Sequence, residues 1–298
     1  MYGAIIGDIV GSKYERSNIK TKDFMFISDG CRFTDDSVMT VAVAKALMRS
    51  RAEKAHFKPI LIDEMQKLGR EYPYAGYGRA FSAWLGAMFP EPYNSWGNGS
   101  AMRASPCGLI AVTLEEAIML ARASAEVTHN HPEGIKGAEA TAAAVFMAKT
   151  CRSKAEIKEY IEKNYYALDK TLDEIRPGYT FDVSCQGTLP PAIIAFLESE
   201  SYEDAIRNAV SIGGDSDTIA AITGAIAWSY YRFNGKGPFS DKKPYRIWTQ
   251  ECEDVIERNM INRMLPDDFV KTIDEFDIVR MQRCGTYDRT GFASEILP

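Results

Sequence analysis

Residues 36–51 read DSVMTVAVAKALMRSR, and this stretch decides the fold class. Ala, Val, Leu and Met recur through it without leaving a clean polar face, at a length that suits a helix. Residues 133–150, EGIKGAEATAAAVFMAKT, have the same character. Helices that are apolar on most sides lie inside a bundle rather than on its surface. The two stretches therefore predict a core of buried helices.

Capping motifs mark shorter helices around this core. Thr113-Leu114-Glu115-Glu116 and Ser153-Lys154-Ala155-Glu156 are capping boxes, in which a hydroxyl and a carboxylate each satisfy a backbone amide, and Ser201 opens a looser third motif. Strand signals are nearly absent, because only residues 180–183 weakly resemble a strand. Alternating strand–helix units would leave β-branched runs, so we predict an all-α fold.

The length of 298 residues is close to the size at which one domain divides into two. Gly and Pro predict loops at residues 73–78, 89–100, 176–191 and 234–244. We find no long linker and no repeat of solenoid length. Residues 1–298 are therefore expected to form a single domain.

Charge and cysteine usage narrow the function classes. The chain carries 35 basic and 41 acidic residues, a net charge of −6, which disfavours binding to bulk nucleic acid or to an anionic membrane. The N-terminus lacks the features of a signal peptide, and the apolar stretch 219–228 is too short to span a membrane. We expect a cytoplasmic protein with free thiols, because no cysteine pair has metal or redox spacing. The cysteines are Cys31, Cys107, Cys151, Cys185, Cys252 and Cys284.

Two acidic segments, FTDDS at residues 33–37 and GGDSDT at residues 213–218, each open an apolar helix. One such segment alone is usually a helix cap, since Asp, Ser and Thr are the preferred N-cap residues. Each segment, however, has two carboxylates, and the second is costly before a buried helix unless a cation compensates it. Oxygen ligands without thiolates suit Mg²⁺, Mn²⁺ or Ca²⁺, and two ions could share this set. The candidate ligands are Thr34, Asp35, Asp36, Asp215, Asp217 and Thr218.

Two further segments have the residues of a ligand site. Residues 96–103, WGNGSAMR, place glycines just before a helix expected near Ser100. Backbone amides at such a point bind anions, typically phosphate, although a plain Asn-Gly turn would explain the segment slightly better if it stood alone. Residues 128–132, THNHP, hold two of the three histidines. His129 is expected to face a phosphate or a ribose hydroxyl, or otherwise to cap a turn before Pro132.

Together these segments resemble the ADP-ribosylglycohydrolase family over nearly the whole chain and in the same order. Gly7-Asp8-x-x-Gly11-x-x-x-Glu15 resembles the opening motif of the family, and Thr34-Asp35-Asp36 and Asp215-x-Asp217-Thr218 resemble its two metal-binding motifs. The resemblance implies a compact all-α fold, an orthogonal helical bundle, with a cleft that holds two Mg²⁺ or Mn²⁺ ions. It implies the six metal ligands named above. The implied substrate-binding residues are Gly97, Asn98, Gly99, Ser100, Met102 and His129, with Tyr93 and Trp96 as adenine-stacking candidates.

The implied activity is metal-dependent hydrolysis of the bond at the anomeric carbon of ADP-ribose in a modified protein or related conjugate. Glu15 is the expected proton-transfer group, although its spacing equally fits an exposed glutamate beside Lys13 and Arg16; Asp36 or Asp217 would otherwise hold the water. Two alternatives remain: a non-catalytic ADP-ribose-binding module and a metal-dependent pyrophosphohydrolase of ADP-ribose. The linkage cleaved, the choice between Mg²⁺ and Mn²⁺, and the oligomeric state stay open.

Overall fold

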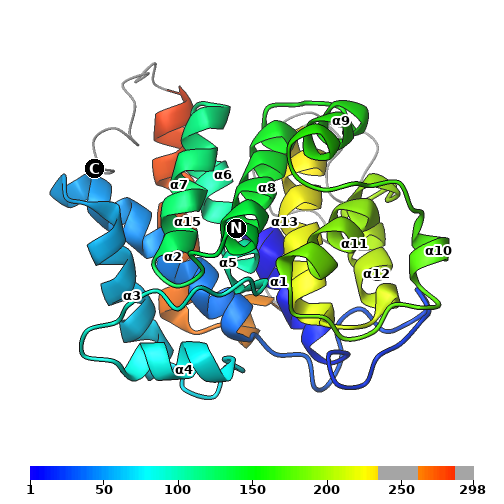
Figure 1. Ribbon diagram of the computed structural model, residues 1–298, viewed down its shortest axis with the longest axis horizontal. Coiled ribbons are helices and arrows are strands. Elements are labelled where there is room, and N and C mark those ends of the chain that lie inside the picture. Colours follow the sequence, from blue (N-terminus) through cyan, green and yellow to red (C-terminus); the bar gives the residue numbers. More distant parts are fainter. Residues whose placement is uncertain (234–260, 286–298) are drawn as a thin grey trace.

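Helix α1 (Tyr2–Ser12) lies along helix α13 (Ser216–Phe233) at the centre of the computed structural model, which describes residues 1–233 and 261–285 (Figure 1). Gly3, Gly7 and Gly11 form a stripe on the contact face of α1, since residues four apart share one face of a helix. A Cβ added at Gly7 would lie 2.1 Å from the Ala220 carbonyl oxygen. Because the stripe lets the two backbones touch, the end of α1 lies beside the start of α13.

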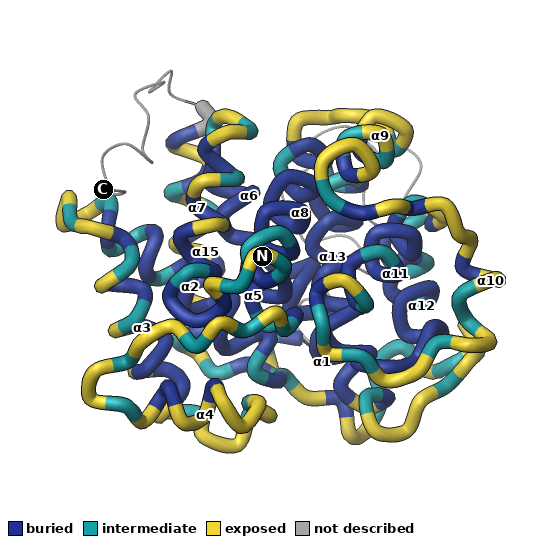
Figure 2. The backbone as a smooth tube through the Cα atoms, in the orientation of Figure 1, coloured by how far each residue is buried: buried dark blue, intermediate teal, exposed yellow. Residues whose placement is uncertain are grey.

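The other helices surround this pair. Helices α8 and α2 pack near the centre, while α4, α9 and α10 lie at the periphery (Figure 2). In chain order after α1, the helices are α2 (Asp35–Glu53), α3 (Phe57–Glu71), α4 (Arg79–Gly86), α5 (Gly99–Met102), α6 (Ser105–Ile110), α7 (Leu114–Glu126), α8 (Pro132–Lys149), α9 (Lys154–Asn164), α10 (Leu172–Ile175), α11 (Cys185–Leu197), α12 (Tyr202–Ile212), α13 and α15 (Asp267–Gly285).

The all-α prediction is confirmed. The described residues contain no β-strand, and residues 180–183 do not form one: the nearest feature is an isolated bridge between Gly97 and Ser184. The buried apolar side chains form one cluster to which all the long described helices contribute. Among the described helices, none combines the length and the apolar character needed to cross a membrane. That all 298 residues form one domain stays a prediction.

The predicted caps occur at the expected helix starts. The Ser153 capping box is complete, and the Ser201 hydroxyl accepts from the Asp204 amide. The Thr113 hydroxyl accepts from the Glu116 amide, but the Glu116 carboxylate accepts from the Val112 amide and forms a buried ion pair with Arg283 at 2.9 Å. The carboxylate of this box therefore also ties α7 to α15.

The predicted loop at residues 176–191 is wrong in its second half, because α11 begins at Cys185 and contains Pro190 and Pro191. Proline inside a helix removes an amide and typically costs about 3 kcal/mol. Here the helix is largely buried, and the Gly187 carbonyl, which Pro191 cannot reach with an N–H, accepts from the Tyr179 hydroxyl at 3.0 Å. Tertiary contacts thus outweigh the local preference.

Some sequence predictions concern residues outside the described part. The predicted loop at residues 234–244, Cys252 and the side chain of Cys284 all lie there. The predicted loop at residues 73–78 is confirmed, and residues 89–98 are also irregular, with α5 beginning at Gly99. The described cysteines are free thiols: Cys31, Cys107, Cys151 and Cys185.

Candidate active site

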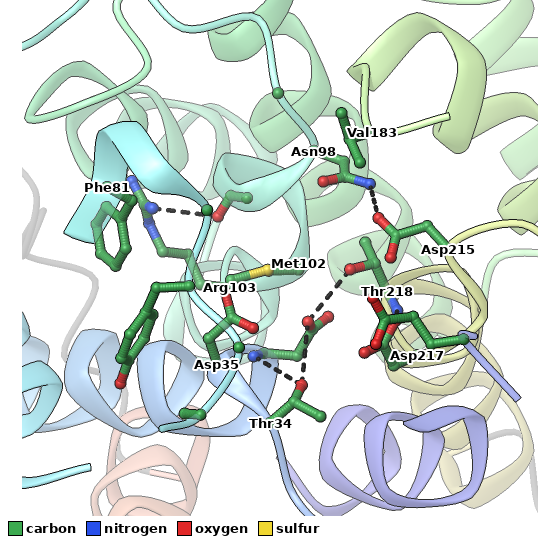
Figure 3. Close-up of a pocket in the computed structure, with 18 of the residues that line it drawn as sticks. Thr34, Asp35, Phe81, Asn98, Met102, Arg103, Val183, Asp215, Asp217 and Thr218 are labelled. Atoms are coloured by element: carbon green, nitrogen blue, oxygen red, sulfur yellow. Dashed lines mark hydrogen bonds between the residues drawn. The ribbon is translucent and has the colours of Figure 1, made fainter. Parts of the chain in front are cut away.

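A cavity of about 490 Å³ opens where the N-terminal ends of α2 and α13 meet (Figure 3). Its acidic part is lined by the predicted metal ligands Thr34, Asp35, Asp36, Asp215, Asp217 and Thr218 together with Glu15. Gly97, Asn98, Gly99, Met102 and His129 line it as well. The structure therefore brings segments that lie up to two hundred residues apart into one cavity.

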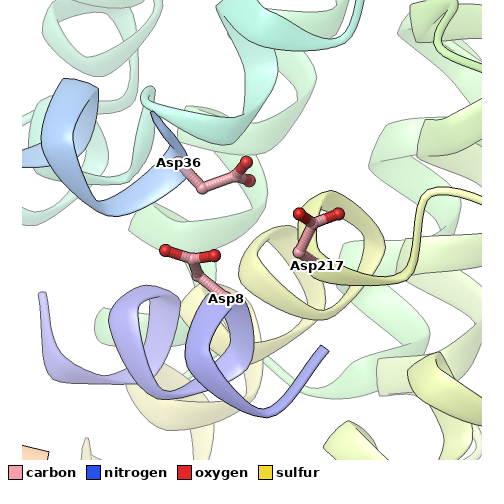
Figure 4. A group of neighbouring side chains, drawn as sticks. All are labelled: Asp8, Asp36 and Asp217. Carbon is pink, nitrogen blue, oxygen red and sulfur yellow. The ribbon is translucent and has the colours of Figure 1, made fainter. Parts of the chain in front are cut away.

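Three carboxylates from three helices point toward one another at the base of the site (Figure 4). Asp8 comes from α1, Asp36 from α2 and Asp217 from α13, and one oxygen of each lies within 4.8 Å of the others. All three side chains are buried. Sequence analysis did not place Asp8 among the ligands, although it noted the segment, because nothing in local spacing shows that α1 touches α13.

A second carboxylate group shares one member with the first. Oxygens of Glu15, Asp215 and Asp217 also lie within 4.8 Å of one another. Glu15 has a side-chain exposure of 17% and a 3.6 Å contact with the exposed Arg16, so it is not the freely exposed glutamate of the alternative interpretation. Asp217 belongs to both groups, so two neighbouring cations could share it as a ligand.

Hydrogen bonds from the chain satisfy Asp8 but leave Asp36 incomplete. Asp8 accepts from the Thr34 hydroxyl and amide at 2.6 and 2.8 Å, and from the Ser37 amide at 3.1 Å. One oxygen of Asp36 accepts from the Thr218 hydroxyl at 3.2 Å, while its other oxygen, Oδ1, is buried without a partner among the described residues. A buried carboxylate oxygen without a donor is costly, and a bound cation would remove that cost.

The electrostatics of the site also call for positive charge. Burial raises the pKa of Asp8 to about 6, and burial together with the charges of Asp8 and Asp215 raises the pKa of Asp35 to about 8. Burial and neighbouring carboxylates raise the pKa of Asp36 and of Asp217 well above the ordinary range. Burial also raises the pKa of Asp215, although its hydrogen bond from Asn98 opposes the rise. The protein supplies too little positive charge to keep these groups ionised.

A hard divalent cation fits these residues. The donors are carboxylate and hydroxyl oxygens, which Mg²⁺, Mn²⁺ and Ca²⁺ prefer, and no thiolate or imidazole belongs to either group in the described part of the chain. Asp35 lies outside both carboxylate groups, although it lines the cavity. Its role as a ligand, like that of Thr34 and Thr218, stays a prediction.

The glycine-rich segment also lines the cavity, but several of its backbone amides already have partners. The Gly97 amide donates to the Ser95 hydroxyl, and the Asn98 amide donates to the Val183 carbonyl at 2.7 Å. Within the described residues, the amides of Gly99 and Ser100 have no acceptor. Gly99 lines the cavity and the fully buried Ser100 does not, so the Gly99 amide is the one available to an anion.

Several predicted ligand-contacting side chains are held by the protein itself. The side-chain amide of Asn98 donates to the Asp215 carboxylate at 2.7 Å and so fixes one carboxylate of the acidic group (Figure 3). The buried Ser100 hydroxyl donates to the Gly134 carbonyl at 2.6 Å, and Ser100 does not line the cavity. Tyr93 lines the cavity, with its ring centroid 5.8 Å from that of His129, whereas Trp96 is 54% exposed and does not line it.

His129 is connected to the buried Arg103 through the Thr128 hydroxyl. Its Nδ1 lies 2.7 Å from the Thr128 hydroxyl, which in turn accepts from Arg103 Nη2 at 2.7 Å. Burial and the nearby Arg103 charge lower the pKa of His129 well below its ordinary value, so the ring is neutral. Sequence analysis missed the role of Arg103, because a lone arginine after Met102 has no distinctive local pattern.

Comparisons with known proteins agree with this geometry. The family model described as ADP-ribosylglycohydrolase matches residues 1–235. The chain is 26% identical to ADP-ribosylhydrolase ARH3 of Homo sapiens, over 91% of this chain and 92% of that protein. It is also 26% identical to ADP-ribosylarginine hydrolase Tri1 of Pseudomonas putida, over 85% of this chain and 74% of that protein. A solved structure titled ADP-ribosylglycohydrolase-related protein complex has the same fold, with a TM-score of 0.63 and 22% identity over 95% of this chain and 94% of that one.

Proposed function

The chain belongs to the ADP-ribosylglycohydrolase family, and on that premise we propose that it is a metal-dependent hydrolase of the bond between ADP-ribose and a group on its anomeric carbon. The substrate would be an ADP-ribosylated protein or a related conjugate. The observation that carries the proposal is the pair of carboxylate groups that share Asp217 at the base of the cavity.

Asp8, Asp36 and Asp217 would hold one ion, and Asp215 and Asp217 would hold a second, with the Glu15 carboxylate beside it. The predicted set adds Thr34, Asp35 and Thr218, all of which line the cavity. When bound, such ions orient ribose hydroxyls and polarise a water molecule. The unpartnered Asp36 Oδ1 supports this assignment, because it is an acceptor that the protein itself leaves unused.

Glu15 is the proposed proton-transfer residue. It lines the cavity, and its carboxylate lies beside Asp215 and Asp217, which supports a role close to the proposed ions. A glycosidic bond breaks through a transition state with oxocarbenium character, so a carboxylate there could take a proton from water or protonate the leaving group. Asp36 or Asp217 would take this role if Glu15 does not.

The nucleotide end of the substrate would lie against Gly99 and His129. The Gly99 amide offers a donor to a pyrophosphate, and His129 lies next to Gly99. Tyr93 is the better-placed candidate for stacking with adenine, because it lines the cavity and Trp96 does not. Met102 is buried and would supply an apolar contact between the two ends.

A product analysis tests the proposal against its two alternatives. Purified protein is incubated with Mg²⁺ and arginine-linked, serine-linked or polymeric ADP-ribose, and the products are separated by chromatography. Release of intact ADP-ribose that EDTA abolishes and Mg²⁺ or Mn²⁺ restores is the expected result. Release of AMP and a ribose phosphate would indicate a pyrophosphohydrolase instead. Tight ADP-ribose binding without any product would indicate a binding module.

A further inference from the structure

A series of buried hydrogen bonds connects Arg103 through Thr128 to His129, and the positions of its hydrogens can be assigned from the contacts. The Arg103 guanidinium donates to the Gly99 and Ser124 carbonyls and, through Nη2, to the Thr128 hydroxyl. Arg103 is 1% exposed and Thr128 is fully buried. An arginine nitrogen is a donor only, so the Thr128 oxygen must be the acceptor in that bond.

The contact between Thr128 Oγ1 and His129 Nδ1, at 2.7 Å, needs one hydrogen between the two atoms. If Nδ1 carried it, the Thr128 oxygen would accept twice, and its own hydrogen would have no acceptor among the described residues. A buried donor without an acceptor typically costs about 1–3 kcal/mol. A doubly protonated ring would instead put a second buried positive charge beside Arg103. The remaining assignment has the Thr128 hydroxyl donating to Nδ1, which leaves the ring hydrogen on Nε2.

The Nε2 atom faces the glycine-rich side of the cavity. Cβ atoms added at Gly97 and Gly99 would lie 3.5 and 3.2 Å from it, and His129 lines the cavity. Among the described residues, Nε2 has no hydrogen-bond partner, and it is not among the buried unpartnered atoms. The ring therefore presents one free N–H to the cavity, close to the Gly99 amide.

We propose that Arg103 and Thr128 are positioning residues that hold His129 as the neutral Nε2–H tautomer, so that it donates a hydrogen bond to an anionic oxygen of the bound ligand. This inference rests on the proposed function for the identity of that ligand, the pyrophosphate of ADP-ribose. It explains why an arginine is buried beside a histidine that, in the described part of the chain, has no hydrogen bond or ion pair with an acidic side chain. The tautomer would be selected by the bond network before any ligand arrives.

The direct test is ¹⁵N-edited NMR of the imidazole rings, since the chain has three histidines and a His129→Gln variant assigns the signal. We expect the parent protein at neutral pH to show an Nε2–H ring at His129. Thr128→Val removes the hydroxyl with little change in shape and should shift the ring toward the Nδ1–H form, while Thr128→Ser should keep Nε2–H. An Nδ1–H or doubly protonated ring in the parent overturns the inference, as does an unchanged tautomer in Thr128→Val.

Ligand affinity gives a second readout. The dissociation constant of ADP-ribose in the presence of Mg²⁺ should rise about tenfold in Thr128→Val, the effect of losing one hydrogen bond. Thr128→Ser should restore it, and the matched control Thr141→Val, which alters a fully buried threonine bonded to Gly137 within α8, should not change it. Equal affinities in the parent and Thr128→Val would count against the positioning role. If the parent does not bind ADP-ribose at all, the proposed function fails, while the NMR spectrum still decides the tautomer.

Discussion

Removal of the metal should make the stability of this protein fall as the pH rises. The folded state holds protons on its buried carboxylates to a higher pH than the unfolded chain does, because burial raises the pKa of Asp8 from 3.8 to about 6 and that of Asp35 to about 8. A group with a raised native pKa is neutral in the folded protein where it is already ionised in the unfolded chain. The free energy of unfolding therefore declines as pH rises from the unfolded value through the folded one.

The fully buried Asp8 sets the order of magnitude of this effect. A rise of about two pKa units is worth about 3 kcal/mol in total, of which roughly half is lost between about pH 5 and about pH 8. For a chain of this length that corresponds to a fall of about 2 °C in Tm, and Asp35, Asp36 and Asp217 act in the same direction. Bound Mg²⁺ should reverse the slope, since its ligands must be ionised to bind it.

Thermal unfolding at about pH 5 and about pH 8 measures how stability changes with pH, once in EDTA and once with Mg²⁺. Asp36→Asn removes the carboxylate whose Oδ1 has no partner, so this variant should be more stable than the parent in EDTA at the higher pH and should lose most of the Mg²⁺ effect. Asp169→Asn, at an exposed position, serves as the control and should follow the parent. A metal-free parent that gains stability toward the higher pH, or an Asp36→Asn variant that is destabilised under both conditions, would refute the reasoning.

Three further substitutions test separate parts of the site. Glu15→Gln should lower turnover by about 10²–10⁴-fold with a much smaller change in ADP-ribose affinity. Turnover within about twofold of the parent would exclude Glu15 from proton transfer. Glu53→Gln, on the exposed face of α2, is the control. Gly99→Val should weaken ADP-ribose binding with the fold retained, because a Cβ at this position would lie 3.2 Å from His129 Nε2. The control Gly178→Val, where an added Cβ meets nothing within 4 Å, should bind ADP-ribose normally. A normal dissociation constant for Gly99→Val would exclude this loop as the phosphate site. Asp217→Asn should abolish calorimetric binding of both ions, while Asp215→Asn should leave one, and equal stoichiometries in the two variants would contradict the shared ligand.

Local sequence was sufficient to locate the acidic segments. Asp35 and Asp36 begin α2, and Asp217 lies in the first turn of α13, so the capping pattern that drew attention to them also defines where their helices start. The excess of carboxylates over what a cap needs was the useful signal. What spacing could not provide was the distance between the two helix starts, because that depends on how α13 packs against α1 and α2.

Other features depended on contacts distant in sequence. The prolines of α11 favour a loop when only neighbouring residues are considered, and the Tyr179 hydroxyl that satisfies the freed Gly187 carbonyl is recognisable only in the fold. Ser100 was predicted to contact ligand, but its hydroxyl is used by the Gly134 carbonyl. A serine that follows a glycine has the same local sequence whether its hydroxyl contacts a ligand or a backbone carbonyl. Only the packing of α5 against α8 distinguishes these two possibilities.

The glycine stripe of α1 shows why the fold and the site cannot be separated in this protein. Gly11 lies against the Ser216 carbonyl oxygen, and a Cβ there would come within 2.4 Å of it, so α1 can approach the start of α13 only where glycine occurs. That approach places Asp8 beside Asp217, and two hydrogen-bond donors on Thr34 then hold Asp8 against the start of α2. A side chain at Gly11 would push α1 away from Asp217, and the carboxylates would separate even if every one of them were kept. The close packing of two helix backbones is therefore a requirement of the proposed metal chemistry as well as of the core.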